Sequence, residues 1–466
     1  MTSTIAEIVF ALSIPVSIGL FFVMRPVQAA LLVAFGSEMF LPEGTNYKLP
    51  FMPAFDKHNL PYLCILIACL LRCPGKVTKL PKGKWINVLA FMVVIGGVVT
   101  GLTNKDPLTF GDGGQAFIPG LTVKDGFFMG ITNFVEAFVP FYVGYALYRS
   151  REDFDRLTAG LAVAGLVYIP FALVELRMSP QWHRWIYGYS QSVFDQTIRW
   201  GGYRPMIFMS HGLALARFFI ATAFALVILG KTRRRLWGLP VKLLAWIQFL
   251  VLIACKSTGA AVLAVAGAPL LIFAKPKRQL QVAALLAWVT VLYPALRLSG
   301  VFPVGSILEA AGALQSERAG SLAFRFDNED ALLERARARI LFGWGEYGRN
   351  VVHDEDGRSS TVLDGHWIIR LSVNGIVGFV TTFGPLLIPV LWARRRVKKM
   401  SNPRDRVAIA GMAFTLTVLS LDLIPNGLWA CYPFFLAGAL TRRIREVQTE
   451  ENEENEAAMD ALPTAA

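Results

Sequence analysis

Charged residues are scarce in this chain of 466 residues, where Asp, Glu, Lys and Arg together make up 17% of the sequence. A soluble globular domain normally carries about 25% charged residues. The hydrophobic residues, 54% of the chain, come in continuous runs rather than in an alternating pattern. A helix needs roughly 20 such residues to cross a hydrocarbon core of about 30 Å, and only helices or closed barrels satisfy their backbone groups in lipid. The composition therefore excludes a series of soluble domains and predicts an all-α, polytopic transmembrane helical bundle.

Cysteine is also scarce, at five residues, and the long loops between the apolar runs contain none of them. No disulfide framework is therefore predicted. The sequence has no cluster of cysteines, histidines or carboxylates with metal-ligand spacing, so we expect neither a metal nor a cofactor. The first hydrophobic run has no basic start and no convincing cleavage site, and is interpreted as a retained span.

The hydrophobic runs predict 12–13 spans. They lie near 5–23, 27–41, 60–71, 85–102, 126–148, 157–174, 206–229, 241–255, 258–274, 280–298, 367–392, 407–422 and 428–440. The run at 27–41 is the weakest, because Glu38 interrupts it.

The positions of Lys and Arg predict the orientation of these spans. The short segments 72–84, 149–156, 231–242, 275–278, 393–406 and 442–445 hold 26 of these residues. The much longer segments 42–59, 103–125, 175–205 and 299–366 hold only 15. The positive-inside rule places the first set in the cytoplasm, together with the C-terminus, and the long loops in the periplasm. The net charge of +13 thus reflects membrane topology, and no nucleic-acid partner is expected.

Four regions follow from this pattern. We predict a membrane bundle over 1–298, a long periplasmic loop with short helices over 299–366, C-terminal spans over 367–441 and a disordered acidic cytoplasmic tail over 442–466. The long loop has 68 residues, far more than a connector needs, and loops of this length are usually functional or disordered.

The long loop also carries the densest group of polar motifs. It contains RFDNEDALLERARARILFGWGEYGRN, in which NEDALLERARARIL has the spacing of an amphipathic helix and precedes a Gly-Trp-Gly turn at 343–345. It ends in LDGHWIIRLSVNGIVGF, which places His366 at the mouth of the next span. This order of motifs, with Gly375 and Gly378 opening the following helix, resembles the O-antigen ligase and polysaccharide polymerase family of bacterial envelopes.

The resemblance implies a metal-independent glycosyltransferase of the inner membrane, which transfers a glycan from an undecaprenyl diphosphate carrier to an acceptor sugar hydroxyl. The departing lipid diphosphate needs positive charge rather than a general acid, and arginine supplies this charge through paired hydrogen bonds. The acceptor hydroxyl needs a general base, a role that histidine fits. We therefore expect His366 to be the catalytic base, and we expect the diphosphate to be bound by Arg204, Arg325, Arg339 and Lys256.

Two of these residues are chosen from their place in the sequence. Pro205 is typical of the first position of a helix, which would place Arg204 at its mouth and His211 deeper on the same face. Lys256 precedes Ser257-Thr258-Gly259, where the family has Ser-Arg-Gly, so it is the nearest substitute for the absent arginine.

Charged residues inside apolar runs are costly and indicate function or internal ion pairs. Arg217 is such a candidate, and Glu136 could be its partner. Simpler interpretations stay open for the other residues. His366 could only cap its span, Arg325 could be a solvated charge, and Arg339 could lie on a helix face against lipid headgroups.

Within the family, an exopolysaccharide polymerase is favoured over a lipopolysaccharide ligase. The expected partners are the undecaprenyl diphosphate-linked glycan, membrane lipid and other polysaccharide assembly proteins. The alternatives are a transporter or flippase of lipid-linked sugars and a non-catalytic scaffold of a polysaccharide export system. A transporter typically has paired repeats with broken helices, and the sequence shows no internal repeat.

Overall fold

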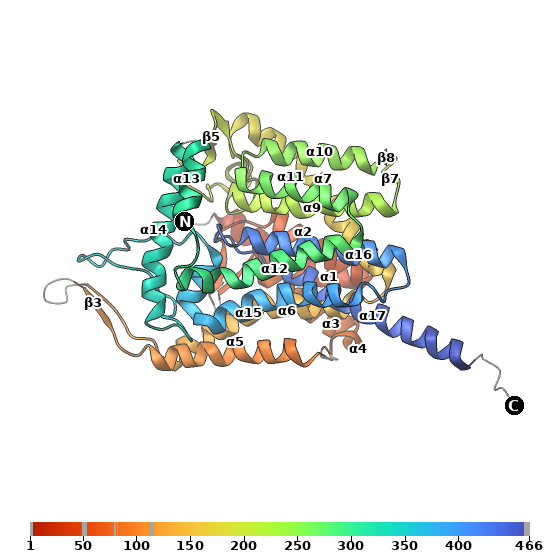
Figure 1. The fold of residues 1–466 in the computed structure, drawn as a ribbon, viewed down its shortest axis with the longest axis horizontal. Coiled ribbons are helices and arrows are strands. Elements are labelled where there is room, and N and C mark those ends of the chain that lie inside the picture. Colours follow the sequence, from red (N-terminus) through yellow and green to blue (C-terminus); the bar gives the residue numbers. More distant parts are fainter. Residues whose placement is uncertain are drawn as a thin grey trace.

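The computed structural model describes residues 3–48, 54–78, 81, 83–110, 116–314 and 316–460, and most of them are helical (Figure 1). Within these residues, seven helices are long and apolar enough to cross a membrane. They are α1 (Thr4–Val23), α5 (Lys84–Thr103), α6 (Val123–Leu147), α7 (Arg151–Met178), α9 (Gly212–Thr232), α12 (Pro276–Leu298) and α15 (His366–Arg396). The all-α class is confirmed, and these helices are those of a multi-pass membrane protein.

The other predicted spans also coincide with helices, but with shorter or more charged ones. They are α2 (Pro26–Phe40), α3 (Leu60–Arg72), α10 (Val241–Ala254), α11 (Thr258–Phe273), α16 (Pro403–Asp422) and α17 (Tyr432–Asp460). The first four have 13 to 16 residues, or about 20–24 Å at 1.5 Å per residue, which is less than a hydrocarbon core. Length and composition therefore support seven of the 12–13 predicted spans.

The connections contain further helices and four short strand pairs. The helices among them are α4 (Pro74–Val77), α8 (Trp182–Tyr187), α13 (Val304–Leu314), α14 (Ser316–Arg337) and the 3₁₀ helix at Phe194–Thr197. Antiparallel pairs are formed by β1 (Asn46–Lys48) with β2 (Ala54–Asp56), β3 (Leu108–Phe110) with β4 (Ala116–Ile118), β5 (Ile198–Arg199) with β6 (Gly202–Tyr203) and β7 (Arg235–Leu236) with β8 (Leu239–Pro240).

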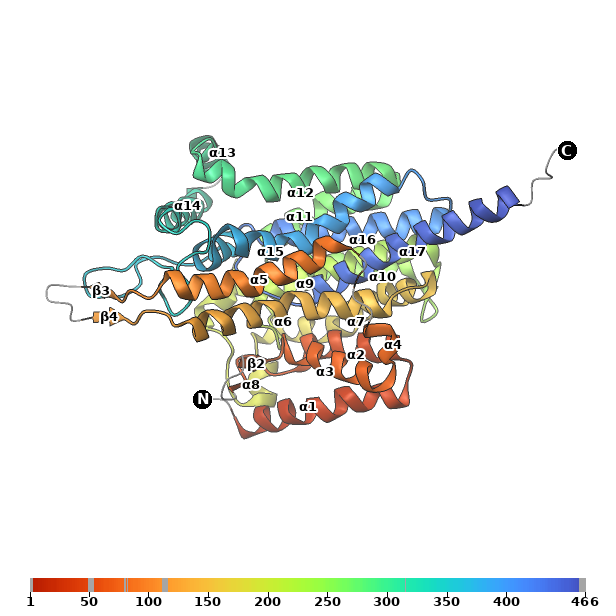
Figure 2. The same cartoon turned by 90° about the horizontal axis from the view of Figure 1, so that it is seen from below.

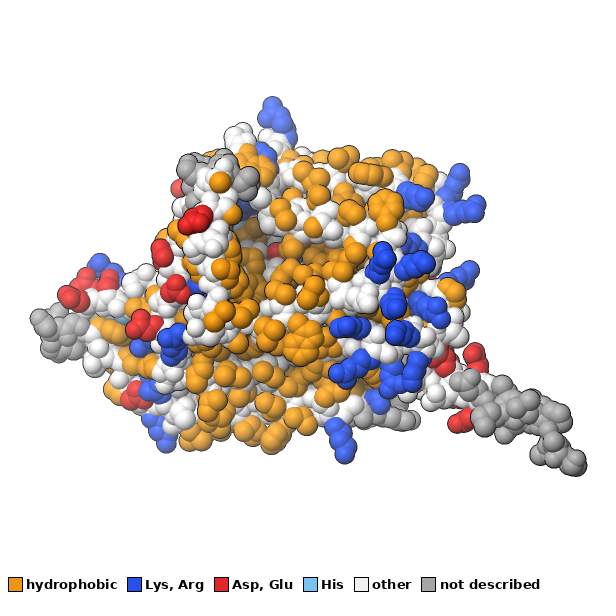
Figure 3. All heavy atoms as spheres, viewed as in Figure 1, with side chains coloured by type: hydrophobic (Ala, Val, Ile, Leu, Met, Phe, Trp, Pro, Cys, Tyr) orange, Lys and Arg blue, Asp and Glu red, His pale blue; other side chains and the backbone are white. Residues whose placement is uncertain are grey.

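The connections gather at two opposite ends of the helices (Figures 1 and 2). One end, which we call the loop end, holds α8, α13, α14 and strands β2 to β5. The other, which we call the basic end, holds α4, the β7–β8 hairpin and the extension of α17. Lys and Arg side chains crowd the basic end in the space-filling view (Figure 3). The two sets of segments separated by their Lys and Arg content thus lie at opposite ends of the bundle.

The Gly-Trp-Gly turn of the long loop fits against a break in helix α15. The helix is interrupted at Gly375, whose φ of 68° lies in the left-handed region. The backbone N–H of Trp344 donates to the Ser372 carbonyl, and that of Gly345 donates to the Val373 carbonyl, each at 2.8 Å. The N–H groups of the loop thus donate to helix carbonyls that the break leaves without a helical partner.

Glycine is required on both sides of this contact. A Cβ atom added to Gly375 would lie 2.3 Å from the carbonyl carbon of Leu341, and one added to Gly343 would lie 2.4 Å from that of Val373. Both obstacles are backbone atoms, which cannot rotate away. The glycines that the sequence analysis singled out therefore let the loop backbone approach the helix.

Two expectations about the helices are wrong. Helix α9 begins at Gly212 rather than near Met206, because the Glu175 carboxylate binds the N–H groups of Met206 and Ile207 at 2.8 Å and the His211 imidazole caps the helix start. Arg204 and His211 are therefore not on one helical face.

The acidic tail is also helical rather than disordered up to Asp460, where α17 ends. Glutamate is a good helix former, and Arg443 binds both oxygens of Glu450 at 2.8 and 3.0 Å across about two turns. Residues 461–466 of the predicted tail lie outside the described residues.

Candidate functional site

His366 is the first residue of α15 and is held firmly at the loop end. Its backbone N–H donates to the carbonyls of Leu423 (2.9 Å) and Asn426 (3.2 Å), in the connection between α16 and α17. Its imidazole is 3% exposed and stacks on the Trp429 indole, with the ring centroids 4.6 Å apart. Its Nδ1 atom lies 3.4 Å from the Gly427 carbonyl oxygen. The side chain is thus oriented by one segment, Leu423–Trp429, which we call the 423–429 segment.

Arg370, one helical turn after His366, determines the tautomer of the imidazole. Its Nε–H donates to Nε2 of His366 at 3.0 Å. Because a guanidinium can only donate, Nε2 must be the accepting nitrogen, and the ring proton lies on Nδ1, toward the Gly427 carbonyl. Nε2 is the atom that would take up a proton as a general base, and in this arrangement its lone pair is occupied.

Arg370 is itself held by polar groups of α6. It donates to Asn133 Oδ1, lies 3.5 Å from Glu136 Oε2 and covers the Trp429 ring at 4.7 Å from its centroid. A small cavity of about 10 Å³, about the room for one water, lies beside it and is lined by Asn133, Asn374 and Trp429 among others. Sequence reasoning did not select Arg370, although a charge four residues after His366 in an apolar run was a readable signal.

Two of the predicted arginines also contact the 423–429 segment. Arg325 of α14 donates to the Pro425 carbonyl at 3.1 Å, and Arg217 of α9 donates to the Leu428 carbonyl at 3.1 Å. Arg217 lies 3.8 Å from Asp422, and both side chains are buried. The suggested pairing of Arg217 with Glu136 is therefore wrong, since Glu136 faces Arg370 and Asp422 faces Arg217.

A second group of cations lies on the β5–β6 hairpin and the turn between α10 and α11, within electrostatic range of Arg325. We call Arg199, Arg204, Lys256 and Arg325 the cation cluster. Arg204 is 6% exposed, and its Nη2 donates to the Lys256 carbonyl at 3.2 Å. The Lys256 ammonium lies over Gly202, where an added Cβ atom would come within 2.0 Å of Nζ.

The cation cluster is poorly compensated. Arg325 lies 3.6 Å from Asp364, but no carboxylate of the described residues pairs with Arg199, Arg204 or Lys256. Among the described residues, no hydrogen-bond partner is found for the buried Nε of Arg204 or the buried hydroxyl of Ser257. The nearby Glu175 already accepts four backbone N–H groups, at Gln181, Trp182, Met206 and Ile207. Buried donors and unpaired cations of this kind favour an anionic ligand.

The pKa values at this cluster reflect the same crowding. Burial and the neighbouring charges of Arg199 and Arg325 lower the pKa of Arg204 to about 10, so it keeps its charge at neutral pH. Burial, followed by the charges of Arg204 and Arg199, lowers the pKa of His211 to about 4. His211 is therefore a neutral cap at neutral pH, whose Nδ1 accepts from the Leu213 N–H at 3.1 Å.

Arg339 is placed differently from the other predicted diphosphate ligands. Its Nη2 atom binds both carboxylate oxygens of Asp106, at 3.0 and 2.8 Å, and its guanidinium covers the Trp344 ring. It also donates to the Thr103 carbonyl. No contact described for Arg339 involves His366 or the cation cluster. It ties the long loop to the end of α5, and we infer a structural role for it.

The described residues contain no group of three or more His, Cys, Asp or Glu side chains placed to hold a metal ion. In comparisons with known proteins, no model of a protein family matches this chain, and no curated protein matches it significantly. The geometry of the loop end is thus the main structural guide to function.

Proposed function

We propose that this protein is a glycosyltransferase of the bacterial inner membrane, which transfers or polymerises glycan repeats from an undecaprenyl diphosphate carrier at its loop end, on the periplasmic side. One observation carries the proposal: the 423–429 segment joins a buried, oriented histidine to a group of poorly compensated cations. Arg325 touches it at Pro425 and His366 touches it at Gly427. The motif resemblance of the long loop supplies the reaction class.

The two halves of this site fit the two demands of the reaction. A bond forms between the acceptor hydroxyl oxygen and the anomeric carbon of the donor, and the bond from that carbon to the diphosphate oxygen breaks. The diphosphate leaves with the electron pair, and the cation cluster would stabilise its charge. The hydroxyl proton passes to Nε2 of His366, acting as a general base.

The hydrogen bond from Arg370 to Nε2 gives this mechanism a specific requirement. His366 becomes a base only when Arg370 turns away from Nε2, and a phosphate oxygen is a stronger acceptor for a guanidinium than a neutral imidazole. In our proposal, the donor therefore draws Arg370 toward the diphosphate and frees His366 in the same step. Such coupling would keep the base inactive until the donor is bound.

The break in α15 bears on the transporter alternative, since broken helices often form substrate sites in transporters. In this protein, backbone groups of the long loop fill the break through hydrogen bonds at Trp344 and Gly345. The break thus serves to attach the loop, which supports a fixed site at the loop end more than a moving pathway. Between the two family activities, we favour an exopolysaccharide polymerase.

The proposal is tested by complementing a deletion strain with single variants whose protein levels are checked in membranes. His366→Ala should insert normally and fail to make polymer, since the loss of a positioned general base typically costs 10²–10⁴-fold. His353→Ala is the matched control, because His353 lies in the same loop, with its ring against Phe110, outside this site.

Four results are informative. Polymer from His366→Ala but not from His353→Ala would show that the wrong histidine has been chosen. Polymer from both would remove the general base from the proposal. Accumulated single repeats on lipid in the deletion strain would indicate a polymerase, and unattached long polymer would indicate a ligase.

A further inference from the structure

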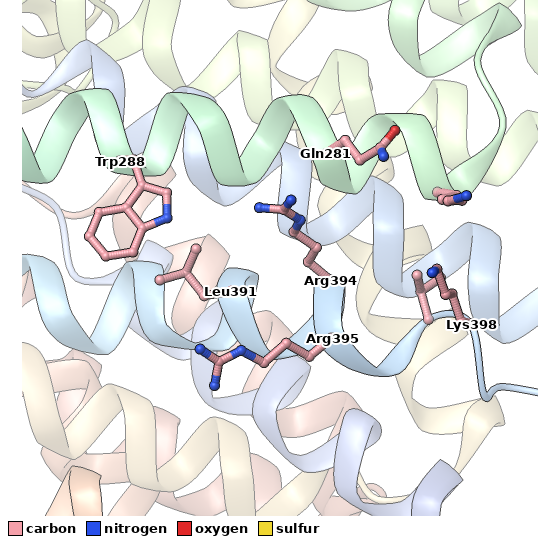
Figure 4. A pocket seen from close by; sticks show the side chains of 8 residues that line it. Gln281, Trp288, Leu391, Arg394, Arg395 and Lys398 are labelled. Carbon is pink, nitrogen blue, oxygen red and sulfur yellow. The ribbon is translucent and has the colours of Figure 1, made fainter.

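A groove lies at the basic end, between α12 and α15, far from the site at the loop end. It has a volume of about 470 Å³ (Figure 4). Its lining residues are Lys277, Gln281 and Trp288 of α12, with Leu391, Arg394, Arg395, Val397 and Lys398 of α15 and the chain that follows it.

The groove is charged at one end and apolar at the other. Lys277, Gln281 and Trp288 are spaced by four and seven residues, so they share one face of α12. Trp288 lies about 16 Å further along the helix than Lys277, at 1.5 Å per residue. In Figure 4, Trp288 and Leu391 lie together at one end of the groove, and Lys398 lies at the other.

The basic run after Trp392 is divided between two surfaces. Arg396 and Lys399 line a hollow that also contains Glu451 and Glu454 of α17. Arg394 and Lys398 instead line the α12 groove, whose described lining contains no carboxylate. Arg395 lines this groove too, but it also lines a second hollow, with Trp85 and Arg445. None of Arg394, Arg395 and Lys398, nor Lys277, has an ion pair or a side-chain hydrogen bond with another described residue. The positive charges of Lys277, Arg394 and Lys398 therefore line the groove, and Arg395 borders it, with no carboxylate among the described lining residues.

We propose that this groove binds an anionic glycerophospholipid, with its headgroup phosphate between Lys277, Arg394 and Lys398 and an acyl chain along Trp288 and Leu391. Basic pockets between membrane helices bind anionic headgroups, and tryptophan favours the membrane interface. A free phosphate would use only the cations, whereas a phospholipid also uses the apolar end, where the Trp288 side chain is 48% exposed. The lipid would thus join α12 to α15, the helix that begins with His366.

Native mass spectrometry of the full chain, purified in a neutral detergent, tests this inference. Wild type is titrated separately with phosphatidylglycerol, phosphatidylcholine and inorganic diphosphate. The main variant is Arg394→Gln with Lys398→Gln. The matched control is Arg234→Gln with Arg235→Gln, which removes two exposed charges from the β7–β8 connection at the same end. Trp288→Ala is a third variant that leaves all charges in place.

We expect phosphatidylglycerol to bind wild type at least tenfold more tightly than phosphatidylcholine. The Arg394/Lys398 variant should weaken this binding about 30-fold, the equivalent of about 1 kcal/mol per cation. The control variant should weaken it less than threefold, and Trp288→Ala should weaken it severalfold.

Equal weakening by the main and control variants would overturn the proposal, because it would indicate general attraction to a basic surface. Equal affinity for the two lipids would do the same. Displacement of the lipid by millimolar diphosphate, with no effect of Trp288→Ala, would identify the groove as a site for a soluble phosphate instead. If the double variant does not fold, Trp288→Ala and Lys277→Gln decide the question by the same measurement.

Discussion

Two groups of arginines at the loop end are held in opposite ways. Arg297 of α12 is buried, lies 3.2 Å from Glu329 and 2.8 Å from Asp330, and covers the Phe326 ring. Arg339 is similarly paired with Asp106. Arg204 is equally buried, yet among the described residues its side chain contacts a backbone carbonyl and is paired with no carboxylate.

The difference separates arginines that hold the fold from those available to a ligand. A paired buried charge is compensated by the protein, so its removal strands the partner. An uncompensated buried charge lowers the stability of the fold, so such a charge is expected where a bound anion neutralises it. We therefore expect the first group to control stability and the second to control activity.

The largest effect should come from breaking the compensated group at Arg297. Arg297→Ala leaves Glu329 buried beside Tyr293 and Trp367 without its cation. Removing one partner of a buried pair typically costs about 3–5 kcal/mol. Thermal unfolding in detergent should show a large loss of stability, while activity per folded molecule stays close to that of wild type.

The double variant Arg297→Ala with Glu329→Gln is the control for this prediction. It removes the stranded charge, so it should recover part of the lost stability. No recovery would mean that Arg297 acts through packing against the phenylalanine rings rather than through the ion pair.

The next largest effect should come from Arg204, where we expect a loss of activity without a loss of stability. Arg204→Ala should lower the rate of glycan transfer about 10²–10³-fold, as the loss of a group that stabilises a leaving anion does elsewhere. Stability should stay unchanged or rise, since the variant removes a buried cation with an unbonded Nε. Transfer from purified lipid-linked donor and the unfolding midpoint are measured on the same preparation.

Arg204→Lys sharpens this test, because it keeps the charge but not the forked geometry. We expect it to lose most of the activity. Full activity in Arg204→Lys would reduce the role of Arg204 to electrostatic attraction, and full activity in Arg204→Ala would remove it from the site.

The sequence was sufficient for the fold class and for the position of most helices, because long apolar runs determine both. It also predicted a helix over 328–341, which overlaps the second half of α14, and a span from 367, one residue after the start of α15. It was insufficient where a side chain replaces a helical hydrogen bond. Glu175 holds the chain before α9 in a non-helical form, and this contact joins residues about thirty positions apart.

The candidate site could be predicted only in part for the same reason. His366 and the arginines were visible as charged or titratable residues beside apolar runs. The 423–429 segment, which contacts His366, Arg325 and Arg217, carries no charge and lies far along the chain, so no local pattern indicated it. The neutralisation of Arg339 by Asp106 is likewise a contact between distant residues. Arg370 alone could have been found from spacing.

The smallest effect concerns His211, which reports on the charge of the cation cluster. Burial and the charges of Arg204 and Arg199 lower its pKa to about 4, whereas an unfolded histidine has a pKa of about 6.5. Between these values the unfolded chain binds more protons than the folded one, so stability is present in full above about pH 6.5 and falls as the pH decreases toward 4. Because His211 is partly exposed, solvent screening limits the effect to on the order of 1 kcal/mol.

His211→Asn keeps a side chain that can cap α9 and should flatten the dependence of the unfolding midpoint between pH 7 and pH 5. Arg204→Ala should flatten it partly, since it removes one of the two charges that lower the pKa, whereas Arg339→Ala should not change it. An unchanged slope in His211→Asn would show that other groups set the acid sensitivity. A slope that Arg339→Ala and Arg204→Ala alter equally would show that the two arginine groups do not differ in the way their contacts indicate.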